Sequence, residues 1–180
     1  MKKNINIAIV GLGQIGIYLY NELIVKRKDI ETKTGKNINI VAISAKNKNK
    51  KRRFKINKKI FYSNPFDIFK EKKIDILFEC IGTSDGISNK IVEFALKKKI
   101  HIITPNKALI AKHGDRLSEL AERNNVNLEF EASVAGGIPI LKTIKEGLAT
   151  NKIKKVYGIL NGTTNYILSE MENSNEDFKK

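Results

Sequence analysis

The chain has 180 residues, 41% of them hydrophobic, which suits one complete domain and part of a second, and its single cysteine, Cys80, excludes an intrachain disulfide. No apolar run reaches the ~18 residues of a membrane-spanning helix, so the sequence predicts a cytoplasmic protein with no membrane partner. The formal net charge of +15 raises nucleic-acid binding as an alternative, but nine basic residues fall within residues 45–60, a segment without a nucleic-acid-binding motif, which favours a solvated lysine-rich surface.

Apolar runs of strand length alternate with helical patterns, which is typical of β-α-β units and a mainly parallel sheet. Helices are predicted after the glycines of residues 11–16, after Asn64-Pro65 and after residues 82–86, and Gly114 is expected to end one helical piece. The pattern predicts a Rossmann-type, doubly wound α/β domain over residues 1–131. Its predicted strands are residues 5–10, 38–43, 74–80, 101–104 and 126–131.

The composition changes near Ala132. A glycine turn at residues 133–137 precedes a helix that is predicted to begin at Ile138-Pro139 and to reach about Ala149. Beyond it, a strand is predicted at residues 156–160, then a polar turn and a last helix that frays from Asn173 onward. One strand and two helices do not complete a domain, so residues 132–180 are expected to be the truncated beginning of a second, α+β domain.

A G-x-G-x-x-G motif follows the first predicted strand and opens the first predicted helix. In this context the first glycine makes the turn, the second lets a pyrophosphate approach the backbone, and the third permits close helix–strand packing. The helix N-terminus adds N–H groups and partial positive charge. Glycines that form only a turn are the alternative. The motif residues expected to bind a dinucleotide are Gly11, Leu12, Gly13, Gln14, Ile15 and Gly16.

The residue that closes the second strand indicates which dinucleotide is bound. An acid there would hydrogen-bond the adenosine ribose and repel a 2'-phosphate, but this chain has Ser44, and no acid follows until Asp67. Lys46 and further basic residues follow instead and are suited to charge-assisted hydrogen bonds with a phosphate. The sequence favours NADP over NAD, with a merely solvated loop as the alternative.

Three later segments carry a family resemblance. They are Thr104-Pro105-Asn106-Lys107, the Glu-Ala-Ser-Val-Ala-Gly-Gly-Ile-Pro segment of residues 131–139, and the Gly-Ile-Leu-Asn-Gly-Thr-Thr-Asn-Tyr-Ile-Leu segment of residues 158–168. In this order and spacing they resemble homoserine dehydrogenase, and the resemblance extends from Ile5 to about Glu172.

The resemblance implies interconversion of L-aspartate 4-semialdehyde and L-homoserine with NAD(P)H, on the route to threonine, methionine and isoleucine. Lys107 matches a family lysine near the nicotinamide and the substrate, where a cation orients the cofactor and stabilises charge on the carbonyl oxygen. Thr83 matches a position that contacts the cofactor. The alternatives from the residues alone are a solvated lysine and a helix N-cap.

The resemblance also implies a bound monovalent cation, commonly sodium, at Glu131, Val134, Gly136 and Ile138. A carboxylate and backbone carbonyls from a glycine turn suit a hard cation, which would brace the junction between domains. A turn that needs no ion is the alternative.

The family's substrate-binding glutamate, its further acidic residues and the lysine taken as proton donor match no position up to Lys180. The resemblance makes residues 132–180 the start of a substrate and dimerisation domain, and the family is homodimeric. Because reduction needs a proton source, low activity is expected of this chain by itself. Three other functions are left open by the sequence: a dinucleotide-binding module without catalysis, one part of a split enzyme, and a basic nucleic-acid-binding protein.

Overall fold

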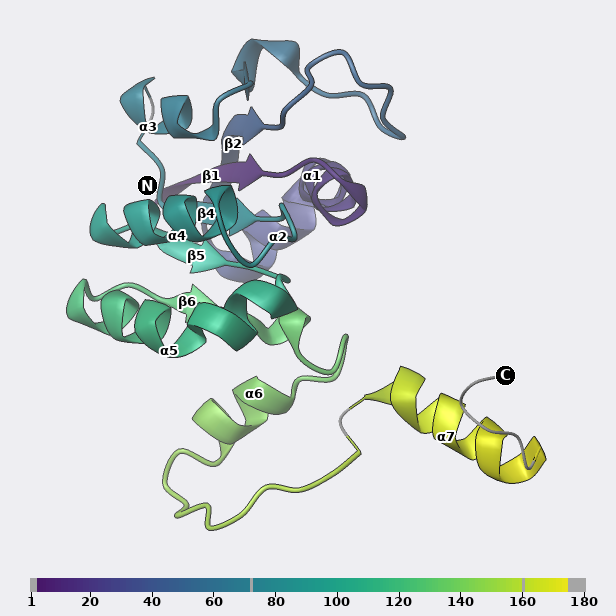
Figure 1. Cartoon of the computed structure of the whole chain (residues 1–180). Coiled ribbons are helices and arrows are strands. Elements are labelled where there is room, and N and C mark those ends of the chain that lie inside the picture. The colour runs from purple at the N-terminus through teal and green to yellow at the C-terminus, as the bar shows by residue number, and fades with distance from the viewer. Residues whose placement is uncertain (1–2, 72, 160, 175–180) are drawn as a thin grey trace. The chain divides into compact units, whose positions relative to one another are not determined.

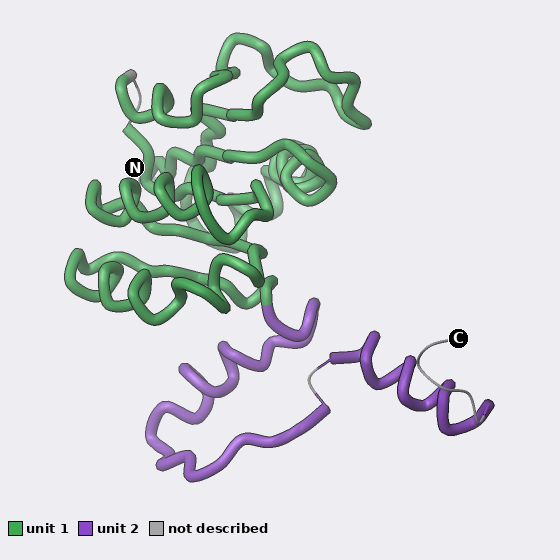
Figure 2. The backbone as a smooth tube through the Cα atoms, in the orientation of Figure 1, with its two compact units in different colours: residues 1–133 green, residues 134–180 purple. Residues whose placement is uncertain are grey.

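The computed structural model describes residues 3–71, 73–159 and 161–174. The chain divides into two compact units, residues 1–133 and residues 134–180, coloured separately in Figure 2. Within the described residues, no helix combines the length and the apolar character that crossing a membrane requires.

The first unit contains a parallel sheet with the strand order β3-β2-β1-β4-β5-β6 (Figure 1). The order reverses between β1 and β4, so the carboxyl ends of these two strands form the switch point at which ligands bind in such sheets. This confirms the predicted doubly wound α/β fold. The strands are β1 (Asn4–Val10), β2 (Asn37–Ser44), β3 (Phe61–Tyr62), β4 (Ile76–Glu79), β5 (His101–Ile103) and β6 (Leu128–Glu129).

Helices cover the two faces of this sheet. One face packs against α1, and the opposite face packs against α3, α4 and α5 (Figure 1). Crossovers between parallel strands are almost always right-handed, so a reversal of strand order places the two sets of helices on opposite faces. The helices are α1 (Gln14–Val25), α2 (Arg27–Thr34), α3 (Ile68–Glu71), α4 (Ile87–Lys97) and α5 (Lys107–Arg123), with 3-10 turns at Lys58–Ile60, Pro65–Asp67 and Glu131–Ser133.

The alternation of side chains along β1 divides the core into two parts. Ile7 and Ile9 lie in the cluster with α1, whereas Ala8 and Val10 lie in the cluster with α4 and α5, and all four are at most 2% exposed. Strands buried on both faces are continuous apolar runs, as β1 is after Asn6. Because β1 is buried on both faces, it holds the glycine turn that follows Val10 in a fixed position.

Two predictions for the first unit were wrong. Helix α5 runs without a break through Gly114, because Leu109, Leu117 and Ala121 continue the same buried stripe on both sides of it. A glycine inside a helix costs about 1 kcal/mol, less than burial of that stripe contributes. The last strand is also shorter than predicted, since β6 ends at Glu129 and the chain enters a 3-10 turn at Glu131.

The second unit is helical where it is regular. It contains α6 (Ile140–Lys142), a π-helical turn (Thr143–Gly147) and α7 (Gly162–Ser174), close to the two helices predicted there. The strand predicted at residues 156–160 was wrong for residues 156–159, which belong to no strand or helix, and Leu160 lies outside the described residues. A strand requires a partner, and the described residues of this unit provide none. Residues 175–180, most of the predicted frayed end, also lie outside the described part.

Candidate functional site

The carboxyl ends of β1, β2 and β4 meet around the glycine turn. The Gly11 N–H donates to the Ser44 carbonyl at 2.8 Å, and the Cys80 N–H donates to the Val10 carbonyl at 2.7 Å. Helix α1 then begins with Gly13 at its N-cap, where no side chain caps the first turn. The N–H groups of that turn are therefore open to an external acceptor, as an anion site at a helix N-terminus requires.

The three motif glycines differ in what surrounds them. A Cβ at Gly11 would collide with the Cys80 backbone, and φ is +93° there; a Cβ at Gly16 would overlap the Gly11 carbonyl oxygen. A Cβ at Gly13 would meet no heavy atom within 4 Å. Gly11 and Gly16 are therefore required by the fold, whereas Gly13 faces open space that a ligand can enter.

A cavity of about 450 Å³ lies beside this turn. Among the described residues, the Ser44 Oγ and the Arg52 Nε are the buried side-chain polar atoms without a hydrogen-bond partner, and both residues line this cavity. Buried polar groups are almost always paired, so two such atoms in residues that line one cavity fit a site for a polar ligand. The cavity is lined by Val10, Gly11, Leu12, Gly13, Ser44, Ala45, Lys46, Asn47, Lys50, Arg52, Ser63, Pro65, Cys80, Ile81 and Ile87.

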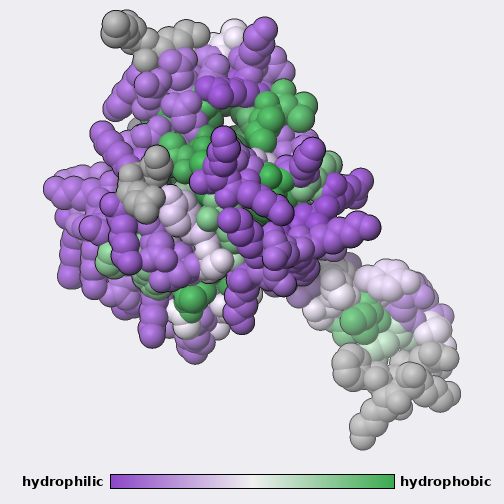
Figure 3. Space-filling view, turned by 90° about the horizontal axis from the view of Figure 1, so that it is seen from above, coloured by the Kyte–Doolittle hydropathy of each residue, from purple (hydrophilic) through white to green (hydrophobic). Residues whose placement is uncertain are grey.

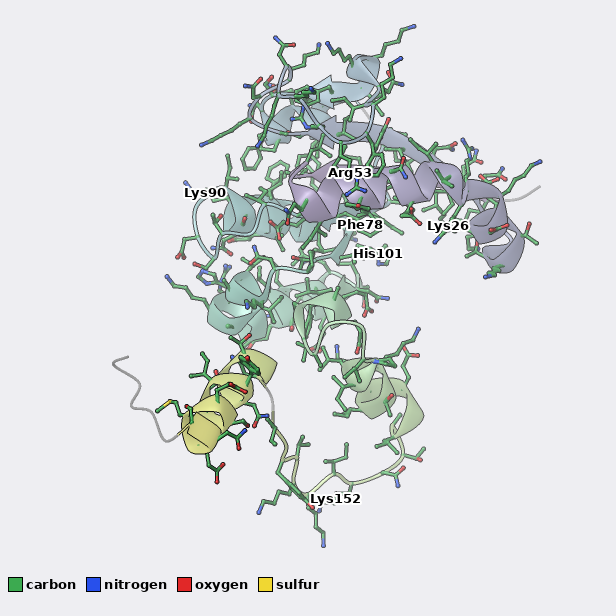
Figure 4. All side chains as sticks on the ribbon, turned by 90° about the vertical axis from the view of Figure 1, so that its right-hand side faces the viewer. Lys26, Arg53, Phe78, Lys90, His101 and Lys152 are labelled. Carbon is green, nitrogen blue, oxygen red and sulfur yellow. The ribbon has the colours of Figure 1, made fainter. Side chains whose placement is uncertain are left out.

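The basic loop of residues 45–60 is held against α1. Arg53, labelled in Figure 4, places its guanidinium 5.0 Å from the centre of the Tyr18 ring. Phe54 meets the same ring edge-on at 5.2 Å. The Asn57 N–H donates to the Tyr20 hydroxyl at 3.0 Å. Figure 3, which looks onto the end of the sheet where β3 lies, shows mostly hydrophilic side chains over this region. The contacts keep part of the loop's positive charge beside the cavity.

Arg52 shapes the same loop from within. Its guanidinium donates to the Asn47 carbonyl at 2.7 Å and to the Lys50 carbonyl at 3.1 Å. These bonds hold the backbone of residues 47–52 around the Arg52 guanidinium. Lys46 and Lys50 consequently line the cavity, whereas Lys48 in the same loop does not.

Thr83 and Lys107 lie in a second group of residues, after β4 and β5. The Asn106 side chain joins their two segments, because its Nδ2 donates to the Thr83 carbonyl at 2.8 Å and its Oδ1 accepts the Leu109 N–H at 3.1 Å. The second bond caps α5, in which Lys107 is the first residue and is exposed. The two predicted contact residues are thus connected through Asn106.

Asp85 ties the loop after β4 to α5. Its carboxylate accepts from the Lys112 ammonium at 2.7 Å and lies 2.9 Å from the His113 Nε2. Hydrogen bonds from Lys112, then His113 and Ser84, hold the pKa of Asp85 well below its usual range. The carboxylate is therefore ionised at neutral pH, where it can hold the loop after β4 against α5.

The predicted site residues are thus distributed over several places. Gly11, Leu12, Gly13 and Lys46 line one cavity, whereas Gln14, Ile15 and Gly16 continue into α1 and do not. Sequence reasoning included Arg52 only as one of the basic loop residues, and it missed the unpaired Ser44 hydroxyl and the buried residues Glu79, Ser88, Thr104 and Asn106. The sequence contained one signal for this buried group, because Glu79 is an acid inside the apolar run of residues 76–81.

Cys80 lines the cavity but is not poised as a nucleophile. Burial, and then the neighbouring Glu79 charge, raise the pKa of its thiol to about 12. The thiol is therefore protonated at neutral pH, where only a thiolate would react.

The residues proposed for a cation belong to both units. Glu131 begins a 3-10 turn in the first unit, and the other three, Val134, Gly136 and Ile138, belong to the second. Ala135 and Gly136 have φ angles of 54° and 63°, in the left-handed region. In the described part of the chain, no group of three or more His, Cys, Asp or Glu side chains could hold a metal ion, so any ligand set here would depend on carbonyls.

Two family models match this chain. The model described as "Homoserine dehydrogenase, NAD binding domain" matches residues 11–131, and the model described as "Homoserine dehydrogenase" matches residues 139–180. The first covers the glycine turn and both groups of predicted contact residues.

Individual proteins give the same picture. The chain is 39% identical to a homoserine dehydrogenase of Neisseria gonorrhoeae, covering 98% of this chain and 40% of that protein. It is 36% identical to one of Bacillus subtilis, covering 94% and 39%. A crystal structure of a homoserine dehydrogenase from Thiobacillus denitrificans superposes with a TM-score of 0.82 at 34% identity, covering 99% of this chain and 41% of that one. The chain spans about 40% of the length of the curated relatives it matches.

Proposed function

Because the chain belongs to the homoserine dehydrogenase family, we propose that it supplies the dinucleotide-binding half of an enzyme that interconverts L-aspartate 4-semialdehyde and L-homoserine. NAD(P)H supplies the hydride when it is bound. We further propose that residues 1–131 bind the dinucleotide and that residues 132–180 begin the substrate and dimerisation domain. The small-molecule substrate and a second copy of the chain are the proposed partners.

The cavity beside the glycine turn is the single observation that carries this proposal. A dinucleotide would bring a pyrophosphate to the space at Gly13 and polar oxygens to the unpaired atoms of Ser44 and Arg52. The glycine turn offers N–H groups at the start of α1, which suit a diphosphate. A titration by calorimetry with NADPH, and with tripolyphosphate as a charge control, tests it. Tight binding of NADPH alone supports the proposal, and equal binding of both would mean general anion attraction.

Lys107 is the proposed catalytic contact at the other end of the cofactor. As the aldehyde is reduced, negative charge develops on its oxygen, and an ammonium near that oxygen stabilises it. The cap formed by Asn106 fixes the start of α5 and so the Cα of Lys107. Thr83, tied to Asn106 through its carbonyl, is the proposed contact for the nicotinamide ribose side.

We propose that NADPH is preferred over NADH, because the cavity has basic residues and a serine where an acid would repel the 2'-phosphate. Lys46→Ala should weaken NADPH binding by about tenfold, the worth of one charge-assisted hydrogen bond, and leave NADH binding unchanged. Calorimetry or fluorescence titration at low and high salt measures both affinities.

Lys48→Ala is the matched control for this prediction. Lys48 belongs to the same loop and carries the same charge but does not line the cavity. Equal effects of the two substitutions would mean that the loop acts only through its overall charge. Equal affinities for NADPH and NADH in the unaltered chain would refute the preference itself.

We also propose, from the family resemblance, that a sodium ion is held by Glu131 and by carbonyls of Val134, Gly136 and Ile138. Oxygen ligands of this kind suit a hard cation. Replacing choline chloride by sodium chloride at equal ionic strength should raise the melting temperature, because a ligand that binds the native state stabilises it. Glu131→Gln should remove that difference, and a difference that persists in the variant would count against this ligand set.

A further inference from the structure

Glu79 is a carboxylate in a position where the fold calls for an apolar side chain. It is the last residue of β4 and is 0% exposed, two residues after Leu77 and therefore on the same face of the strand. Leu77 belongs to the core that α4 and α5 cover. Burying a charge is costly unless hydrogen bonds or an opposite charge compensate for it.

Three donors compensate for the Glu79 charge. Its Oε1 accepts the Ile81 N–H at 2.8 Å and the Ser88 hydroxyl at 3.0 Å, and its Oε2 accepts the Thr104 hydroxyl at 2.7 Å. Ser88 and Thr104 are both 0% exposed. No Lys, Arg or His among the described residues forms an ion pair with Glu79. The carboxylate is thus held by donors from the loop after β4, from the first turn of α4 and from the turn after β5.

The first set of bonds fixes the loop after β4. Because Ser88 donates its proton to Glu79, its oxygen is left as an acceptor. The Thr83 Oγ1 lies 3.0 Å from that oxygen and also donates to the Asp85 carbonyl at 3.2 Å. The Glu79 carboxylate therefore sets the direction of the Ser88 proton, and Ser88 in turn contacts the Thr83 hydroxyl.

The second set fixes the turn after β5. Because Thr104 donates its proton to Glu79, its oxygen accepts the Asn106 N–H at 3.0 Å. Asn106 then caps α5 through Leu109 and donates to the Thr83 carbonyl. Both sets of bonds converge on the two segments that present Thr83 and Lys107.

We propose that Glu79 is a positioning residue for the nicotinamide half of the dinucleotide. It binds no part of the cofactor, but its two oxygens lock the loops after β4 and β5 in the arrangement that places Thr83 and Lys107 together. This inference rests on the proposed function, because it requires a nicotinamide cofactor that reaches these two loops.

Glu79→Gln tests the charge with almost no change in size. The amide has one oxygen, which the fixed N–H of Ile81 requires, so its NH2 group faces Thr104. Thr104 already accepts from Asn106, and its own proton then has no acceptor in a buried place. The substitution should therefore loosen the turn before Lys107 while the rest of the core keeps its packing.

The experiment compares two ligands on the 180-residue chain. NADPH carries both halves of the cofactor, whereas adenosine 2',5'-bisphosphate carries only the adenosine half. Glu79→Gln and Thr104→Val should each weaken NADPH about tenfold, as one lost charge-assisted bond implies, and change the bisphosphate affinity by less than about twofold. A merely structural role for Glu79 would lower both affinities together.

Ile91→Val is the control for stability alone, because Ile91 is a wholly buried core residue of α4. It should lower the melting temperature without changing either affinity. Equal weakening of both ligands by Glu79→Gln, or no change in a folded variant, would overturn the inference. If Glu79→Gln fails to fold, Thr104→Val and Ser88→Ala decide the question by the same comparison. If the unaltered chain binds neither ligand, the proposed function fails, and this inference fails with it.

Discussion

Gly13→Val is expected to abolish dinucleotide binding, with a loss of at least ~100-fold in affinity, and to leave the fold intact. A side chain there would project into the space that the pyrophosphate must enter. The backbone tolerates the change, because φ at Gly13 is −76° and a Cβ would meet no heavy atom within 4 Å. Calorimetry with NADPH measures the affinity, and circular dichroism measures the fold.

Gly16→Ala is the matched control from the same turn. Its Cβ would overlap the Gly11 carbonyl oxygen, so this substitution should cost roughly 1–3 kcal/mol in the free energy of unfolding, the usual penalty of overpacking. Gly13→Val should therefore lose binding at unchanged stability, whereas Gly16→Ala should show a clear loss of stability. Retained NADPH affinity in Gly13→Val would show that the phosphate site lies elsewhere.

The 180-residue chain by itself is expected to turn over aspartate semialdehyde and NADPH at least ~100-fold more slowly than a complete homoserine dehydrogenase. The chain spans about 40% of the length of its relatives, and the family resemblance implies that the proton-donor lysine and the substrate-binding acids match none of its residues. General acid catalysis typically contributes about 10²–10⁴-fold. A steady-state assay beside the full-length Neisseria gonorrhoeae relative measures the ratio.

The relative shortened to the portion that aligns with these 180 residues provides the matched control, and it should lose activity to the same degree. Lys107→Ala in the present chain should reduce whatever turnover remains, because Lys107 is the proposed catalytic contact. Full activity from the 180-residue chain would mean that the proton source lies within it. Lys107, or a water molecule held by Asn161 and Thr163, would then be the candidate.

The sequence was sufficient for most of the fold, because the strands of the first unit are short apolar runs followed by turn residues. It failed at β3, which has two residues and no detectable period, and at α2, whose residues are all at least partly exposed. It also failed at Gly114. A glycine there indicates a helix end, but α5 continues because its buried side chains lie on both sides of Gly114. Pairing with β2 decided the case of β3, and packing of the buried stripe decided that of α5.

The candidate site was predictable only in part, because several of its contacts join segments that are far apart in the sequence. A motif marks the glycine turn, but no local pattern shows that Ser44 and Arg52 would reach one cavity with buried atoms unpaired. Glu79 stood out as an acid in an apolar run, yet its donors come from Ser88 and Thr104, which are 9 and 25 residues away. Bonds between distant segments of the chain become visible only in the folded sheet.

The central claim is that the carboxyl ends of β1, β2 and β4 hold a nicotinamide dinucleotide, and amide NMR during a titration with NADPH tests it most directly. The account predicts that the resonances of residues 11–16, Ser44 and Thr83 shift and saturate together at one ligand per chain, and that the Gly13→Val chain shows none of these shifts. Shifts confined to the lysines of residues 45–60, or no saturation, would contradict the account.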